Sequence, residues 1–370
     1  MAYETLEMLI DGQWVQGSGG RTQAVVNPAT EEAFAQVPLA EAADLDRAIE
    51  ASTRAFKTWG KTTPFERQAI MEKAARLLEE RKDAIAETLT RENGKPLAEA
   101  KAEIDVTIGF TRWFGEEAKR SYGRLIPARS PGARQMAVKE PVGPASAFVA
   151  WNFPGSNVIK KLSAAMAAGC TLIMKPAEET PGTAVALARA YHDAGLPAGV
   201  LNIVFGVPSD VSEHVLASPH IKKMSFTGSV PVGKHLARLA ADNLIRTTME
   251  LGGHAPVVVF DDADIENALN SMHAFKFRNA GQVCISPTRF YVQQDVYNRF
   301  VEGFTERVNA MQVGNGLDAN TNMGPLIAQR RLEVMEEFVA DAKDHGATVA
   351  TGGERIGNQG YFYAPTVLKD

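Results

Sequence analysis

The sequence predicts an α/β protein with a parallel sheet in one domain, a second α/β domain and a protruding β-hairpin arm. From Pro144 onward, short apolar runs alternate with amphipathic stretches, which is the pattern of parallel strands covered by helices on both faces. A second series of this kind begins at residues 256–260, PVVVF. The segment 122–143 is rich in proline and glycine and interrupts the preceding helical pattern, which indicates a hairpin that stands off the body.

The N-terminal region predicts a small layer of β-hairpins followed by three helices. Apolar and polar residues alternate around Asp11-Gly12, and Asn27-Pro28 marks a turn, which together are typical of hairpins. Apolar residues then recur at helical spacing in three segments, 44–59, 64–93 and 96–121.

The two alternating series predict the remaining elements. In the first series we expect strands at 145–151, 170–175, 200–205, 222–226 and 246–251, with helices from Ser156, Thr183 and Val230 and near Asp210. In the second series we expect strands at 256–260, at 288–293 and near Ala364, with helices from Asp264 and Asp295. The natural boundary lies at Leu251-Gly252-Gly253. Residues 1–121 and 142–253 are therefore predicted to form a nucleotide-binding domain, 122–141 an oligomerisation arm, and 254–370 a second, catalytic domain.

Composition limits the classes of partner. The 370-residue chain is 45% hydrophobic and 22% charged, close to the average of folded proteins, and its formal net charge is −5. Its lysines and arginines are scattered, so a small molecule is expected as the partner rather than nucleic acid or a membrane. No apolar run reaches the roughly 18 residues of a membrane span, and the N-terminus does not resemble a signal peptide, so a cytoplasmic location is expected. The two cysteines have no metal-binding spacing, and we expect no metal.

Five short stretches carry the candidate chemistry. In chain order they are AWNFPG (150–155), MKPAEETP (174–181), FTGSVPVG (226–233), MELGGH (249–254) and GQVC (281–284). In this order and at these spacings, they resemble the aldehyde dehydrogenase superfamily over essentially the whole chain. The run ISPTRF after Cys284 is similar to that of succinate-semialdehyde dehydrogenases. The resemblance implies oxidation of an aldehyde to an acid through a cysteine thiohemiacetal, hydride transfer to a nicotinamide dinucleotide and hydrolysis of a thioester.

Cys284 is the expected nucleophile. Glycine, glutamine and serine surround it, which indicates a backbone bend near a polar cleft, whereas Cys170 precedes an apolar strand and is expected to be structural. The alternative for Cys284 is a small buried hydrophobe. By resemblance, the side-chain amide of Asn152 joins the backbone N–H of Cys284 in an oxyanion hole. The alternative for Asn152 is a turn before Phe-Pro.

Two more residues are expected to move protons. Glu250 is the candidate base that activates water for thioester hydrolysis, provided that burial raises its pKa toward neutrality. A solvated glutamate at a strand end is the alternative. The resemblance also gives Lys161 a part in proton transfer, although a lysine on a helix is usually only solvated.

The resemblance assigns a further set of residues to the dinucleotide. The run FTGSVPVG ends a strand and begins a helix, so Gly228 and Ser229 would face a pyrophosphate. Lys175 and Glu178 would contact the adenosine ribose, and because a carboxylate there repels a 2′-phosphate, NAD is expected rather than NADP. An acidic helix N-terminus without a ligand explains Glu178 equally well. The full expected set is Trp151, Lys175, Glu178, Gly206, Phe226, Gly228, Ser229 and Leu251.

Two cations suggest the class of aldehyde. Lys160 and Arg278 fall at positions that line the aldehyde pocket in the family, and two cations there suit a carboxylate at the far end of the substrate, as in succinate semialdehyde. The alternative is that both cations point to solvent. Phe153 and Ser286 complete the expected substrate-binding set.

The C-terminal end raises a second hypothesis. Family members usually extend well beyond the position of Asp370, and the E-x-F-G-P motif expected there is absent, so the second domain is expected to be incomplete. An intact enzyme is expected to be a homodimer or homotetramer. The rival hypothesis is a non-catalytic dinucleotide-binding or interaction module, left when the fold lost its C-terminal portion.

Overall fold

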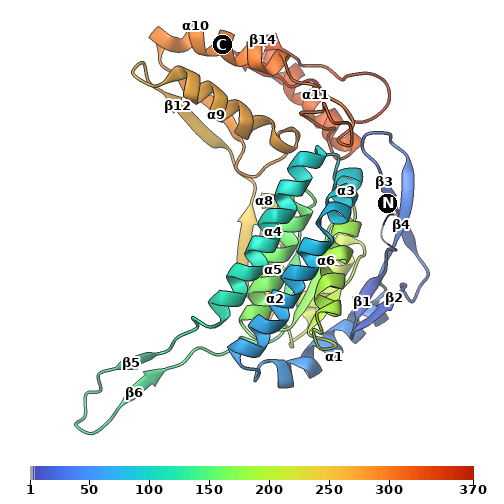
Figure 1. The fold of residues 1–370 in the computed structure, drawn as a ribbon, viewed down its shortest axis with the longest axis vertical. Coiled ribbons are helices and arrows are strands. Elements are labelled where there is room, and N and C mark those ends of the chain that lie inside the picture. Colours follow the sequence, from blue (N-terminus) through green and yellow to red (C-terminus); the bar gives the residue numbers. More distant parts are fainter. Residues whose placement is uncertain (1–2, 4) are drawn as a thin grey trace. The chain divides into compact units, whose positions relative to one another are not determined.

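The computed structural model describes residue 3 and residues 5–370, which form two compact units (Figure 1). The first unit contains the described residues up to Ala24 together with Gln36–Ile85 and Glu103–Glu250, and the second contains Val25–Ala35, Ala86–Ala102 and Leu251–Asp370. The division after Glu250 lies at the expected boundary. Segments 25–35 and 86–102, expected in the first domain, pack with the second unit instead. Their partners are distant in sequence, as where the amide of Leu97 donates to the carbonyl of Gly316 at 2.8 Å, and periodicity does not reveal such contacts.

A seven-stranded sheet forms the centre of the first unit, in the order β11-β10-β7-β8-β9-β1-β2. Its strands are β1 (Met8–Ile10), β2 (Gln13–Val15), β7 (Ala145–Phe148), β8 (Leu172–Lys175), β9 (Leu201–Ile203), β10 (Lys223–Gly228) and β11 (Arg246–Leu251). Strands β10, β7, β8 and β9 run parallel, which confirms the predicted parallel sheet. The predicted hairpin at Asp11-Gly12 forms the other edge of this sheet, because β1 pairs antiparallel with both β9 and β2.

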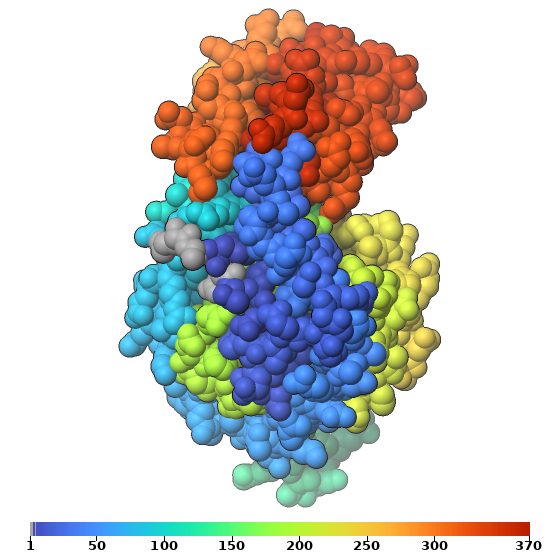
Figure 2. All heavy atoms as spheres, turned by 90° about the vertical axis from the view of Figure 1, so that its right-hand side faces the viewer, coloured from blue at the N-terminus to red at the C-terminus, as the bar shows by residue number. Residues whose placement is uncertain are grey.

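Helices cover both faces of this sheet. Helices α2 (Pro64–Glu80), α5 (Pro154–Ala167) and α6 (Pro181–Asp193) pack together on one face, and α1 (Ala42–Trp59), α7 (Pro208–Ala217) and α8 (Val230–Asp242) pack on the other. In the space-filling view, the N-terminal strands and α1, in blue, form one surface of this unit (Figure 2).

The predicted single helix over 64–93 is wrong. The structure has α2 and then α3 (Lys82–Asn93), because the backbone leaves the helical region at Arg81, with φ −99° and ψ 4°. The apolar spacing continues across this one-residue break, so the sequence pattern does not show it. The next helix, α4 (Leu97–Ala118), agrees with the predicted segment.

The predicted hairpin arm is present. Strands β5 (Arg124–Ile126) and β6 (Gln135–Ala137) pair antiparallel and protrude from the first unit (Figure 1). Leu125 and Met136 lie opposite one another and are 72% and 76% exposed. The role of this arm in assembly remains a prediction.

The second unit has its own α/β core. Strands β12 (Ala255–Val259) and β13 (Pro287–Val292) pair in parallel and pack with α9 (Ile265–Phe277) and α10 (Gln294–Asn309). A buried apolar cluster joins these elements, with Val259, Leu269, Phe277, Phe300 and Phe304 among its members.

Some elements lie outside the predicted series. Helix α11 (Gln329–Asp344) and strand β14 (Thr348–Thr351) were not predicted, and the last strand is β15 (Val367–Lys369) rather than one near Ala364. Strands β3 (Thr22–Val26) and β4 (Ala33–Pro38) form a separate two-stranded sheet. Among the described residues, no helix combines the length and the apolar character needed to cross a membrane.

Candidate functional site

The parallel strands of the first unit bring most of its predicted site residues to one edge of the sheet. Phe148 at the end of β7 lies opposite Lys175 at the end of β8 and opposite Phe226 in β10. Because neighbouring parallel strands end at the same edge, the segments that follow them meet there. These segments hold the loop 151–153 after β7, Glu178 after β8, Gly206 after β9 and Gly228-Ser229 after β10.

The loop after β7 leads into α5, whose first turn is held by a buried carboxylate. One oxygen of Glu103 on α4 accepts the amides of Gly155 at 2.9 Å and Ser156 at 3.0 Å. Glu103 is 5% exposed. A carboxylate at this position satisfies helix N-terminal amides and complements the helix dipole. These two amides are thus bound to Glu103, and in the preceding loop Oδ1 of Asn152 accepts the side-chain amide of Asn157 at 3.1 Å.

Lys161 and Glu250 lie close enough to interact electrostatically. Burial lowers the pKa of Lys161 to about 8, and the attraction of Glu250 acts in the opposite direction. The ammonium of Lys161 donates to the hydroxyl of Ser225 at 3.1 Å, and the hydroxyl of Thr227 donates to Glu250 at 3.4 Å. Glu250 itself is exposed, so the burial expected around this carboxylate is absent.

The predicted dinucleotide residues show features that fit a bound nucleotide. Lys175 and Glu178 are both buried and form an ion pair, so a charged pair lies at the end of β8. Ser229 is the N-cap of α8, yet its side chain makes no capping hydrogen bond. Its hydroxyl and the first amides of α8 therefore suit an anion. A Cβ at Gly206 would lie 2.7 Å from a methyl of Val211, which requires glycine there.

The remaining members of this set also lie at or beyond strand ends. Trp151 is half-buried in the loop after β7, Phe226 is buried in β10, and Leu251 is the last residue of β11.

In the second unit, Cys284 follows a left-handed turn. Asn279, Ala280 and Gly281 have φ values of 50°, 54° and 73°. Glycine adopts this region without cost, but an alanine does so only under strain that its surroundings must support. Cys284 is a half-buried free thiol, whereas Cys170 is buried at 5% exposure. Cys284 is therefore more accessible than Cys170, in the sense expected if Cys170 is structural.

Polar side chains hold this turn in place. The carboxylate of Glu99 accepts the amide of Asn279 at 2.9 Å. The side-chain amide of Gln282 donates to the carbonyl of Asn279 at 3.1 Å, and its oxygen accepts the amide of Ile327 at 3.1 Å.

Beyond the thiol, the half-buried Lys276 contacts the same segment. The hydroxyl of Ser286 donates to the carbonyl of Lys276 at 3.4 Å, and the ammonium of Lys276 donates to that hydroxyl at 3.4 Å. Burial lowers the pKa of Lys276. Ser286 thus exchanges hydrogen bonds with Lys276, and the predicted contact of Ser286 with substrate stays a prediction.

The two predicted substrate cations lie in different units. Lys160 is half-buried, and its ammonium lies 4.9 Å from the centre of the Phe110 ring on α4, a cation–π contact. Arg278 ends α9 directly before the left-handed turn and is half-buried. The ammonium of Lys160 thus has an aromatic partner, and the part of both cations in substrate binding stays a prediction. Phe153 is half-buried next to Asn152.

Sequence reasoning missed the residues that hold the predicted ones. Glu99, Glu103, Asn157 and Lys276 each contact a segment that carries a predicted site residue. On the sequence, each is an ordinary polar position of a helix. Their partners lie at other positions of the fold, so no local signal identifies them.

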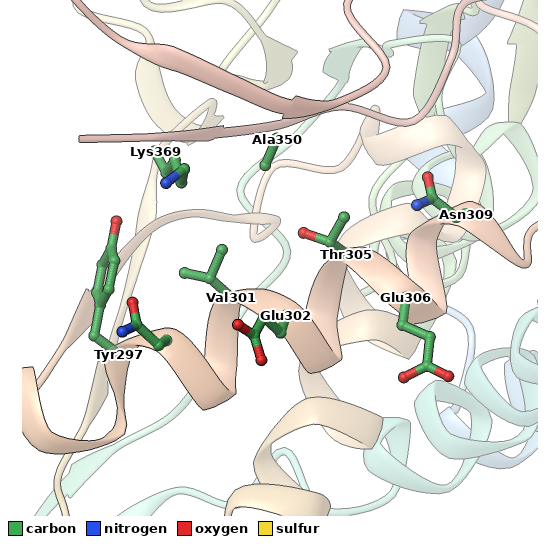
Figure 3. Close-up of a pocket in the computed structure, with 9 residues that line it drawn as sticks. Tyr297, Val301, Glu302, Thr305, Glu306, Asn309, Ala350 and Lys369 are labelled. Atoms are coloured by element: carbon green, nitrogen blue, oxygen red, sulfur yellow. The ribbon is translucent and has the colours of Figure 1, made fainter.

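A hollow of about 580 Å³ lies elsewhere in the second unit, along α10 and the β14–β15 hairpin (Figure 3). It is lined by Tyr297, Asn298, Val301, Glu302, Thr305, Glu306, Asn309, Ala350 and Lys369. None of these is a predicted site residue. Among the described residues, no group of three histidine, cysteine, aspartate or glutamate side chains is arranged to hold a metal.

Comparison with known proteins identifies the family. Residues 14–370 match the model of the aldehyde dehydrogenase family. The chain is 44% identical over 368 residues to the 4-(hydroxymethyl)benzenesulfonate dehydrogenase TsaD1 of Comamonas testosteroni, covering all of this chain and 76% of the relative. It is 41% identical over 364 residues to the NADP(+) succinate-semialdehyde dehydrogenase GabD of Escherichia coli, covering 98% of this chain and 76% of the relative.

The fold agrees with this assignment. The structure is similar to a crystal structure of succinate-semialdehyde dehydrogenase from Burkholderia pseudomallei, with a TM-score of 0.97 at 40% identity over 98% of this chain and 76% of that one. On sequence and on structure alike, the chain belongs to the aldehyde dehydrogenase family.

Proposed function

We propose that this protein oxidises an aldehyde bearing an anionic group to the corresponding acid, with a nicotinamide dinucleotide as oxidant and Cys284 as nucleophile. The observation that carries the proposal is the half-buried thiol of Cys284, which follows a strained left-handed turn held by Glu99 and Gln282. Backbone strain that polar contacts maintain is typical of sites that must present one side chain in a fixed position. Family membership disfavours the rival non-catalytic module.

The chain supplies a group for each chemical step. The thiolate of Cys284 adds to the carbonyl carbon, a C–S bond forms and the carbonyl oxygen becomes an alkoxide. The side-chain N–H of Asn152 donates to that alkoxide. Ser229, Lys175 and Glu178 would hold a nicotinamide dinucleotide, which would supply the acceptor for the hydride that leaves this carbon and so leave a thioester on Cys284. Glu250, which is exposed in this structure, then takes a proton from water, the water oxygen attacks the thioester, and the thiolate of Cys284 leaves.

The first unit offers residues that would hold the dinucleotide. Ser229 and the N-terminal amides of α8 suit the pyrophosphate, and the buried pair of Lys175 and Glu178 suits ribose hydroxyls. Glu178 favours NAD, since its carboxylate repels a 2′-phosphate, but its ion pair with Lys175 partly offsets that charge. The relative GabD is named for NADP(+), whereas we propose that this chain prefers NAD.

The proposed substrate carries a carboxylate or a sulfonate at its far end. The named relatives act on a benzenesulfonate and on succinate semialdehyde, both of which bear an anionic group away from the reacting carbon. Arg278 lies six residues before Cys284 and directly before the left-handed turn. A guanidinium at that place suits bidentate binding of such an anion. Lys160 contributes less, since its ammonium lies over the Phe110 ring.

The nucleophile is tested by replacing each cysteine in turn. We expect Cys284→Ser to abolish aldehyde-dependent NADH formation and Cys170→Ser to retain most of it, because hydride transfer requires the thiohemiacetal. Absorbance of NADH at saturating dinucleotide gives the rate, and intact-protein mass verifies each variant. Equal losses in the two variants would refute the assignment.

The substrate class is tested with two aldehydes of equal length, succinate semialdehyde and butanal. We expect the wild type to prefer the acidic aldehyde. Arg278→Ala is expected to raise KM for that aldehyde by about 10- to 150-fold, which corresponds to the roughly 1.5–3 kcal/mol of one charged hydrogen bond. The KM for butanal should change little. A wild-type preference for butanal, or equal weakening of both substrates in the variant, contradicts the anionic-substrate proposal.

A further inference from the structure

An amide that stabilises an alkoxide must present the correct end. The side chain of Asn152 carries an NH₂ group that can donate to an anion and a carbonyl oxygen that repels one. The two ends have nearly the same shape, so steric packing distinguishes them poorly. A donor bound to the oxygen of Asn152 would select the orientation that turns NH₂ to the alkoxide.

Asn157 supplies such a donor. Its side-chain nitrogen donates to Oδ1 of Asn152 at 3.1 Å, and its side chain is buried at 8% exposure. Asn157 lies in the first turn of α5, where its amide donates to the carbonyl of Phe153 at 2.8 Å. Side chains of an α-helix tilt toward its N-terminus. A residue at this position therefore points back over the loop that contains Asn152.

The first turn of α5 is a fixed support for this contact. Glu103 binds the amides of Gly155 and Ser156, which ties the start of α5 to α4. A Cβ at Gly155 would lie 2.9 Å from the hydroxyl of Thr107 and 3.1 Å from the carboxylate of Glu103, so the close approach of the two helices requires glycine. The contacts of Gly155 and Ser156 with α4 thus fix the start of α5, which carries Asn157, next to the loop that contains Asn152.

We propose that Asn157 is a positioning residue, which binds the carbonyl oxygen of Asn152 and so turns the NH₂ group of that side chain toward the alkoxide. This inference rests on the proposed function, in which Asn152 donates to the alkoxide. Asn157 makes no bond to substrate in this role. It acts on the acylation step through Asn152 alone, so its effect should appear in the rate of that step and not in substrate binding.

The test compares two variants of Asn157 that differ in what they offer to Asn152. Asn157→Asp has the same shape, but its ionised carboxylate only accepts hydrogen bonds and therefore draws the NH₂ group of Asn152 toward itself. Asn157→Leu removes the donor without adding an acceptor. The measured quantities are the rate of the NADH burst, KM for the aldehyde and the thermal unfolding midpoint.

We expect Asn157→Asp to slow the burst by roughly 10²–10³, as much as Asn152→Ala, since either change removes one oxyanion donor. Asn157→Leu should slow it less than Asn157→Asp, because the amide of Asn152 then samples both orientations. KM should stay within a small factor in both variants. Combining Asn157→Asp with Asn152→Ala should add no further loss beyond Asn152→Ala alone, because both act on the same group.

The possible failures are distinguishable. If Asn152→Ala slows the burst less than tenfold, the oxyanion role of Asn152 is wrong and the proposed function must be revised. If Asn152→Ala has its full effect but Asn157→Asp does not, only the role of Asn157 is overturned. A rise in KM at an unchanged burst rate would show that Asn157 contacts substrate instead. If Asn157→Asp does not fold, the burst rates of Asn157→Leu, Asn152→Ala and the double variant are compared instead. If the double variant is slower than Asn152→Ala by the full factor that Asn157→Leu costs alone, the proposal is overturned.

Discussion

The two units present their reactive groups by different physical means. In the first unit, Lys175 ends a parallel strand and Asn152 and Ser229 follow two others, so the register of the sheet brings them to one edge. In the second unit, Cys284 follows three successive left-handed residues that no regular element would impose. The first arrangement follows from topology, whereas the second depends on side chains that hold a strained backbone.

The contrast predicts different responses to mutation. Groups at strand ends have backbones fixed by the sheet, so their replacement should remove one chemical function and leave the rest intact. The thiol-bearing turn has a backbone fixed by Glu99 and Gln282, so loss of a support should disturb the geometry of the nucleophile itself. Three experiments examine this difference, beginning with the largest expected effect.

The first experiment removes the candidate base at a strand end. Glu250→Gln should lower steady-state turnover by roughly 10²–10⁴, the usual contribution of a general base. The thiol of Cys284 should still react, so a stoichiometric burst of NADH should persist before slow turnover. Rapid-mixing absorbance measures both phases. Loss of the burst together with turnover would mean that Glu250 acts earlier than thioester hydrolysis.

The second experiment weakens the support of the left-handed turn. Glu99→Leu removes the acceptor of the Asn279 amide, and we expect turnover to fall by about tenfold or more, from the roughly 1.5–3 kcal/mol of a charged hydrogen bond. Glu99→Gln keeps an oxygen acceptor and is the matched control, with a smaller loss. Adding Ala280→Gly to Glu99→Leu should restore activity in part, because glycine adopts a positive φ without strain.

This second comparison has a clear contrary result. If Glu99→Leu and Glu99→Gln lose the same activity, and Ala280→Gly restores none of it, the turn does not depend on the Glu99 contact. The two units would then not differ in the way described above. Thermal unfolding of all three variants separates a local change of the turn from general destabilisation.

The third and smallest effect concerns Lys161, a half-buried lysine of the first unit. Burial lowers the pKa of Lys161 to about 8 from 10.5. Between these values the unfolded chain binds more protons than the folded one, so the stability of the wild type should rise with pH over this range. The rise in the free energy of unfolding should total at most about 3 kcal/mol, as expected for a pKa shift of this size. Below pH 8, Lys161 is protonated in both the folded and the unfolded chain, so the free energy of unfolding stays at its lower value.

Lys161→Met should remove this rise. The free energy of unfolding in urea, measured from pH 7 to pH 10, should increase with pH more steeply for the wild type than for the variant. Lys57→Met, at an exposed position on α1, is the control and should follow the wild type. Parallel curves for the wild type and Lys161→Met would show that burial does not shift the titration of this lysine.

Local sequence patterns determined much of the first unit. The alternation of apolar runs and amphipathic stretches from Pro144 onward predicted strands β7 to β11 and the helices between them. The prediction succeeded because each helix or strand buries one face against its neighbours, so its apolar residues recur with the period of that helix or strand. Asn152, Lys175 and Ser229 could be placed at one edge of the sheet for the same reason.

The sequence was less informative where the spacing of apolar residues does not follow the path of the backbone. The break at Arg81 interrupts a helix without interrupting its apolar spacing, so the pattern predicted one helix where there are two. Segment 86–102 packs with the second unit through contacts such as that of Leu97 with Gly316, which lie far apart in the chain. The role of Glu250 as base was conditioned on burial, and the structure leaves this carboxylate exposed, since exposure depends on what the surrounding fold covers.

By itself, the sequence determined the fold class and the family and nominated the candidate reactive side chains, because these follow from local periodicity and from short motifs. Only the tertiary structure decided how the reactive groups are held. Glu99, Glu103 and Asn157 are ordinary polar residues of helices on the sequence, and each gains its role from a hydrogen bond to a residue elsewhere in the fold or at the helix entrance. The direction of such a bond depends on three-dimensional placement, which neither composition nor spacing encodes locally.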